Sequence, residues 1–61
     1  MRRTIRWALN ELATERKAIS MTQLCQLTNL KSSQLVEHRD YIVEVATDLE
    51  LVFDARCKLA P

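Results

Sequence analysis

The sequence predicts a small, mainly α-helical domain of three helices followed by one β-strand. Apolar residues recur at the 3.6-residue spacing of amphipathic helices through most of the 61 residues. There is no glycine and the single proline is the last residue, so few positions suit the tight turns of a hairpin. From Leu49 to Leu59, apolar and polar residues alternate with a period of two, which is typical of a half-buried strand.

The length and composition argue against an enzyme. A chain this short forms one domain, residues 1–61, and buries only about 60% of its unfolded surface. It leaves little room for a substrate cleft, and the sequence has no nucleophile–base pair or phosphate-binding loop. We therefore expect no catalysis, no cofactor and no small-molecule substrate. No segment approaches the ~20 apolar residues that span a membrane, and the N-terminal segment lacks a secretory apolar run, so we expect a cytoplasmic protein.

The two cysteines do not indicate a metal site. Cys25 and Cys57 lie 32 positions apart and neither belongs to a CxxC pair. His38 has no second ligand near it in the sequence. We expect two reduced, partly buried thiols, with a disulfide as the minor alternative.

The first helix is predicted over residues 3–17. Ile5, Leu9 and Leu12 form one apolar stripe, with charged residues opposite. Trp7 lies off the centre of this stripe, so it either packs on a later element or stays half exposed. Residues 18–20 form a short extended link.

The second helix is predicted over residues 21–28. Ser20 and Gln23 match the S-x-x-Q capping box, in which each side chain accepts a hydrogen bond from the other residue's backbone N–H. Leu24 faces the core. Asn29 ends the helix, because asparagine is the commonest residue after glycine at a left-handed helix end.

The third helix is predicted over residues 32–47. Ser32 or Ser33 can cap its start. Leu35, Ile42, Val45, Ala46 and Leu49 keep a helical spacing beyond it. His38 leans inward, where we expect a histidine hydrogen-bonded locally at the edge of the core.

The strand is predicted over residues 49–59, with a helix as the competing interpretation. It has two possible partners: the extended piece around Ile19, as in a winged helix, or the same strand of a second chain in a two-fold dimer. Antiparallel pairing centred near Ala55 would place acids opposite bases. The dimer interface would then hold Leu51, Phe53, Ala55, Cys57 and Leu59.

Charge is distributed unevenly along the chain. Residues 1–39 hold seven basic and three acidic side chains, a net charge of +4. Residues 40–61 hold two basic and five acidic ones, a net charge of −3. The first two-thirds could therefore face phosphates, although an ordinary solvated surface explains the same pattern.

Residues 21–40 resemble the helix-turn-helix superfamily of DNA-binding proteins. The offsets that carry the resemblance are Leu24, Cys25 at the helix crossing, Asn29 at the turn, Leu30 behind it and Leu35. With its leading helix and C-terminal strand, the chain is similar to small phage- or plasmid-type regulators of the Cro/repressor kind, and almost equally to a minimal winged helix.

The resemblance implies a transcriptional regulator, such as a repressor, that binds double-stranded DNA as a homodimer with helix 32–47 in the major groove. Asn29 stands where the family usually has glycine, and Glu37 places an acid on the groove face. Val36 stands at a base-facing offset beside it. The expected DNA contacts are Arg2, Arg3, Arg6, Lys31, Ser32, Ser33, Gln34, Glu37 and Arg39.

Two other functions fit the same sequence. The near-neutral net charge and Glu37 favour a protein-interaction module on a helix-turn-helix scaffold, since a fold does not determine a function. A phage or plasmid replication or packaging accessory is the third possibility. The arginines at the N-terminus could equally be a solvated end of the chain.

Overall fold

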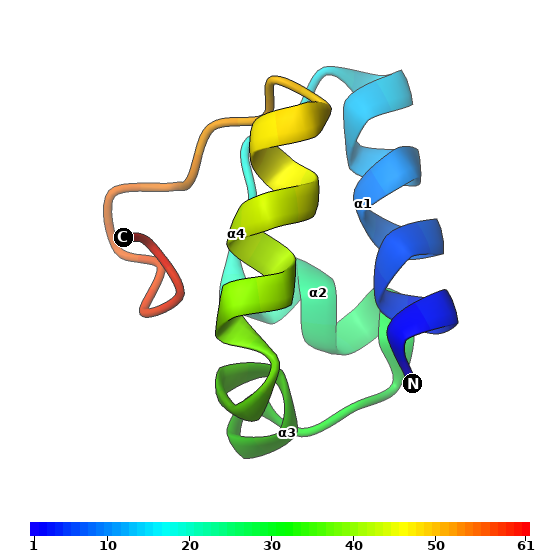
Figure 1. The fold of residues 1–61 in the computed structure, drawn as a ribbon, viewed down its shortest axis with the longest axis vertical. Coiled ribbons are helices and arrows are strands. Elements are labelled where there is room, and N and C mark those ends of the chain that lie inside the picture. Colours follow the sequence, from blue (N-terminus) through cyan, green and yellow to red (C-terminus); the bar gives the residue numbers. More distant parts are fainter.

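The computed structural model describes all 61 residues and contains four α-helices and no β-sheet. The helices are α1 (Arg2–Glu15), α2 (Met21–Thr28), α3 (Ser32–Glu37) and α4 (Arg39–Asp48). Helix α1 packs on both α2 and α4, and α3 lies at the lower end of α4 (Figure 1). The expected mainly helical domain is confirmed in this coarse form. No helix has the length and apolar character needed to cross a membrane.

Helix α1 buries the predicted stripe but ends two residues earlier than expected. Ile5, Leu9 and Leu12 are fully buried. Arg16 adopts the left-handed conformation, with φ 57°, and stops the helix. The N–H of Arg16 donates to the Ala13 carbonyl and the N–H of Lys17 to the Leu12 carbonyl. This is the Schellman arrangement, in which the last carbonyls of a helix are satisfied by the residues that leave it.

The other two left-handed residues also end helices. Asn29, with φ 58°, ends α2 as predicted. Glu50, with φ 58°, follows α4, and the N–H of Leu51 closes the same arrangement by donating to the Ala46 carbonyl at 2.9 Å. Asparagine and aspartate are the residues other than glycine that adopt this conformation most readily. At Arg16 and Glu50 the helix-end hydrogen bonds hold other residues in it.

Glycine at position 50 is expected to stabilise the protein. A left-handed residue with a Cβ costs roughly 1–2 kcal/mol, and glycine removes most of this cost. Glu50→Gly should therefore raise the free energy of unfolding by about 1 kcal/mol. The matched control is Glu44→Gly in the exposed interior of α4, which should lower it by about 1 kcal/mol. Urea denaturation of both variants checks this prediction, and a loss of stability in both would refute it.

The single helix predicted over 32–47 is divided into α3 and α4 at His38. The backbone there has φ −104° and ψ 19°, and the His38 N–H donates to the Leu35 carbonyl. The inward positions that follow Leu35 hold His38 and Arg39 rather than apolar side chains. With no apolar side chain to bury there, the chain bends before Ile42 returns to the core.

The predicted strand over 49–59 is not formed, and the C-terminal segment (residues 49–61) follows an irregular path along α4 (Figure 1). A single parallel bridge joins Phe53 to Ile19. The Ile19 N–H donates to the Val52 carbonyl at 2.9 Å, and the Asp54 N–H donates to the Ile19 carbonyl at 2.8 Å. The expected pairing with Ile19 is therefore limited to one residue pair.

A turn at Asp54 explains why the strand stops. The Asp54 carboxylate accepts from the Arg56 N–H at 2.9 Å, and the Asp54 carbonyl accepts from the Cys57 N–H at 2.9 Å. A second turn follows, in which the Ala60 N–H donates to the Cys57 carbonyl at 3.2 Å. Aspartate favours such turns because its side chain satisfies a backbone N–H two residues on.

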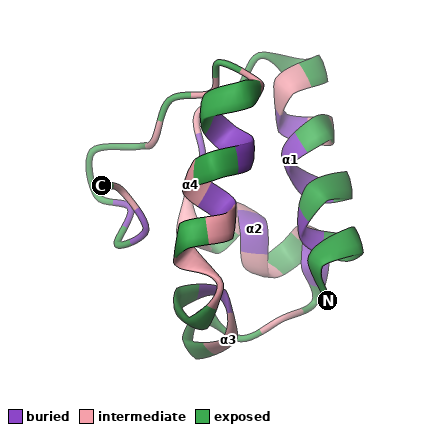
Figure 2. Cartoon of the chain, in the orientation of Figure 1, coloured by how far each residue is buried: buried purple, intermediate pink, exposed green.

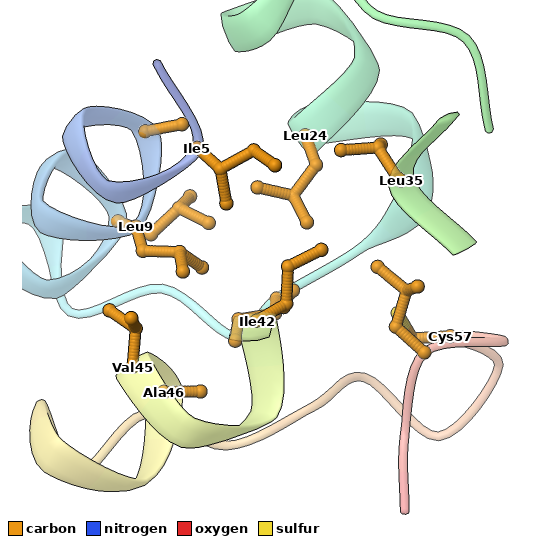
Figure 3. Close-up of a cluster of buried hydrophobic side chains, with 12 residues drawn as sticks. Ile5, Leu9, Leu24, Leu35, Ile42, Val45, Ala46 and Cys57 are labelled. Atoms are coloured by element: carbon orange, nitrogen blue, oxygen red, sulfur yellow. The ribbon is translucent and has the colours of Figure 1, made fainter. Parts of the chain in front are cut away.

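One core lies between the helices and is closed on one side by the C-terminal segment (Figures 2 and 3). Leu24, Leu35 and Ile42 converge at its centre, and Cys57 reaches in from the C-terminal segment (Figure 3). Leu59 is fully buried in the same core.

The residues expected at a dimer interface are therefore placed differently. Cys57 and Leu59 are buried in the chain's own core, whereas Leu51 and Phe53 are partly buried against it. Ala55 is exposed at the turn. The alternation in the sequence reflects burial within one chain, and no strand edge is available for pairing with a second chain.

Candidate functional site

Side chains hold both ends of α2, and the one at its C-terminal end holds the turn into α3. The Ser20 hydroxyl accepts from the Gln23 N–H at 3.1 Å, which confirms Ser20 as the predicted cap. The second bond of the predicted capping box, from the Ser20 N–H to the Gln23 side chain, is not formed. At the other end, the buried Thr28 hydroxyl donates to the Leu24 carbonyl at 2.6 Å and accepts from the Leu30 N–H at 3.2 Å. Sequence analysis missed Thr28. Its position next to Asn29 was the available signal, since threonine hydroxyls often satisfy backbone groups at turns.

Helix α3 is capped differently from the prediction. Its N-cap is Lys31, whose N–H donates to the side-chain oxygen of Gln34 at 3.0 Å. Neither Ser32 nor Ser33 caps the helix, so the expected serine cap was wrong. Both serines lie in the first turn of α3 and are exposed. Their hydroxyls are thus left for other partners, while the Gln34 oxygen is already in use.

The outer face of α3 carries two parallel rows of exposed side chains. Residues four apart are neighbours on a helix, so Ser32 and Val36 form one row and Ser33 and Glu37 form the other. Only Leu35 of this helix is buried. The outer face therefore combines two hydroxyls, one aliphatic side chain and one carboxylate within about one turn of the helix.

An open hollow of about 400 Å³ lies beside the first row, between the start of α2, helix α3 and the C-terminal segment. Two cationic side chains from the C-terminal segment border it. The lining residues are Met21, Ser32, Ser33, Val36, Arg56 and Lys58. Arg56 and Lys58 are exposed, and neither forms an ion pair with a carboxylate. Hydroxyl donors and two cations at one hollow suit an anionic ligand.

Arg56 and Lys58 were not predicted at this site. They are the bases that antiparallel strand pairing near Ala55 would have placed opposite acids, although the alternation itself indicated that they are exposed. Cys57 and Leu59 turn into the core, so the residues between and before them must face solvent. What the sequence could not supply is the path that brings this segment next to α3.

The N-terminal arginines lie on α1 and outside the hollow. The Arg2 guanidinium stacks over the Tyr41 ring of α4, 4.8 Å from its centroid. The Met1 sulfur is 3.1 Å from the Nε2 of His38, so the start of α1 lies against the corner between α3 and α4. Arg3 and Arg6 are exposed, and neither forms an ion pair.

Arg39, which is among the expected DNA contacts, holds the C-terminal segment in the structure. Its Nη2 donates to the Ala60 carbonyl at 3.0 Å, and its Nη1 lies 3.9 Å from an oxygen of Asp40. The side chain is 38% exposed. The contact with Ala60 ties the segment that carries Arg56 and Lys58 to the start of α4.

Acidic side chains are gathered on the surface away from the core. Glu37, Asp40, Glu44 and Asp48 follow one another at spacings of three or four, and all are exposed. The last three form an acidic stripe along α4, opposite the buried Ile42 and its neighbours, whereas Glu37 is the last residue of α3. This stripe repels anions, so this face of α4 does not suit a ligand that carries phosphates.

No group of His, Cys, Asp and Glu side chains is placed to hold a metal ion, and both cysteines are free thiols. The side-chain contact of His38 is with the sulfur of Met1, 37 positions away in the sequence, so the expected local hydrogen bond was wrong, and His38 does not line the hollow. The chain matches no protein-family model, no curated protein and no solved structure.

Proposed function

We propose that the chain is a small DNA-binding protein that lays the outer face of α3 in the major groove of duplex DNA. The observation that carries the proposal is the hollow where the exposed serines of α3 meet Arg56 and Lys58. Serine hydroxyls hydrogen-bond base edges, and cations hold the phosphates that flank a groove. The resemblance of residues 21–40 to helix-turn-helix proteins supports the same arrangement.

In the proposed binding mode, two segments of the chain make different contacts with the DNA. Lys31, Ser32 and Ser33 face the DNA from α3, while Arg56 and Lys58 contact the backbone from the C-terminal segment. Affinity comes mainly from the phosphate contacts and specificity from the α3 side chains. Occupation of an operator by such a protein would regulate transcription by blocking other proteins from the site.

A salt titration of binding to random-sequence duplex DNA tests this proposal. The logarithm of the binding constant should fall linearly with the logarithm of the salt concentration, because each phosphate contact releases counterions. Fluorescence anisotropy of a labelled duplex measures it. No binding at low salt would refute the proposal.

Glu37 is expected to limit non-specific binding. Its carboxylate lies beside Ser33 on the α3 face and is not paired with a cation. Phosphates repel it unless it accepts from a cytosine amine. Glu37→Gln should raise the affinity for random duplex DNA by up to about fivefold, the effect of one charge about 4 Å away in water. Glu44→Gln, on the acidic stripe of α4, is the control and should change this affinity little. Equal effects of the two substitutions would contradict the proposed face.

A protein-interaction module is the second candidate, and the exposure of Trp7 favours it. This side chain is 49% exposed on α1, away from the buried stripe. Aromatic residues are enriched in protein interfaces, and folding does not require a tryptophan at an exposed position. Retention of DNA binding in Trp7→Ala would separate this surface from the proposed DNA-binding face.

A further inference from the structure

We infer that Val36 recognises the 5-methyl group of a thymine in the DNA site. The inference rests on the proposed function and names one base that the α3 face selects. Val36 is 48% exposed on a six-residue helix, and it lines the hollow together with the two serines. Four large hydrophobic side chains are exposed in the chain, and Val36 is the one that lines this hollow.

Folding gives no reason for valine at this position. The core side of α3 is occupied by Leu35, which is fully buried. Valine is a weaker helix former than alanine or the long straight side chains, because branching at Cβ restricts its rotamers. An exposed valine in so short a helix therefore costs stability and contributes little to the core. A ligand that buries the two methyl groups of Val36 would offset this loss of stability.

The chemistry of the major groove identifies that ligand as thymine. Base edges there present hydrogen-bond donors and acceptors, and the thymine methyl is the one apolar group among them. The serine hydroxyls both donate and accept, so they fit several bases. An aliphatic side chain favours thymine alone. Arg56 and Lys58, across the hollow from Val36, would hold the adjacent backbone and keep the helix in register.

The experiment removes only the methyl group. Binding sites are first selected from a random duplex library, and each thymine of the selected site is then replaced by uracil. At one or more positions this replacement should weaken binding of the natural chain about fourfold, the equivalent of one buried methyl group. The Val36→Ala variant should bind the thymine site more weakly by a similar factor and should no longer distinguish thymine from uracil there.

Val52→Ala is the matched control, since Val52 is also exposed, at 68%, but does not line the hollow. It should keep the full sensitivity to uracil. The inference is overturned if no uracil replacement weakens binding, or if Val36→Ala keeps the sensitivity. Binding to random duplexes without enrichment of any sequence would also overturn it, while the proposed DNA binding would stand. Absence of any duplex binding would overturn both.

Discussion

Replacement of Leu59 by alanine is expected to lower the free energy of unfolding by about 2–5 kcal/mol, the usual cost of such a truncation in a core. The Leu59 side chain is fully buried although only two residues, Ala60 and Pro61, follow it in the sequence. At the usual value per residue, a chain of this length has a total stability of roughly 3–9 kcal/mol. The substitution therefore removes much of it, and the variant should be partly unfolded at room temperature.

Urea denaturation followed by far-UV circular dichroism measures this loss. Val52→Ala is the control in the same segment, because Val52 is 68% exposed and its truncation should change stability by at most about 0.5 kcal/mol. Equal effects of the two substitutions would show that the C-terminal segment does not pack on the core. A denaturation midpoint that rises with protein concentration would instead indicate that the chain self-associates, since subunit association stabilises by mass action.

Removal of both cations at the hollow is expected to weaken DNA binding and to flatten its salt dependence. Each phosphate contact contributes about 0.9 to the slope of log K against log salt. The double variant Arg56→Ala, Lys58→Ala should therefore lower the magnitude of the slope by roughly 1.8, with little change in stability because both side chains are exposed. Anisotropy titrations with the same random duplex at several salt concentrations measure it.

The control for this double variant removes the same charge at the opposite end of the molecule. Arg16 and Lys17 lie beside the turn after α4, far from α3 (Figure 1). Arg16→Asn with Lys17→Ala keeps a residue that tolerates the left-handed conformation of Arg16. This control should keep the slope of the natural chain. If both double variants lowered the magnitude of the slope of log K against log salt by the same amount, binding would depend on net charge and not on the hollow.

The helices could be predicted largely from local patterns, because their signals are local. The apolar stripe of α1 and the bounds of α2 follow from spacing and from the caps at Ser20 and Asn29. The break at His38 was missed because the apolar spacing continues at Ile42 beyond it. The polar residues His38 and Arg39 at inward positions were the signal in the sequence that a single long helix would bend there.

The C-terminal segment could not be predicted in the same way. Alternation from Leu49 to Leu59 shows which side chains are buried, but it does not show what buries them. A strand partner and the chain's own core give the same pattern. The turn at Asp54 and the contact between Arg39 and Ala60 decide the outcome, and the second of these joins residues 21 positions apart.

The candidate site was predicted in part. Lys31 and the two serines of α3 are exposed as the helix-turn-helix resemblance implied. The cations beside them come from a segment whose path depends on tertiary packing, so no local motif could place them there. Arg39 was predicted to contact DNA, and its hydrogen bond to the distant Ala60 carbonyl could not be inferred from the sequence.

Mapping of the DNA contact on the isotopically labelled chain by NMR tests the central claim most directly. A short random duplex is titrated into the protein at low salt, and the backbone amide shifts are followed. We predict that the largest changes fall on residues 31–36 and 56–58, with α1 around Trp7 and the far end of α4 little affected. Changes centred on Trp7, or no changes at all, would contradict the proposed DNA-binding face.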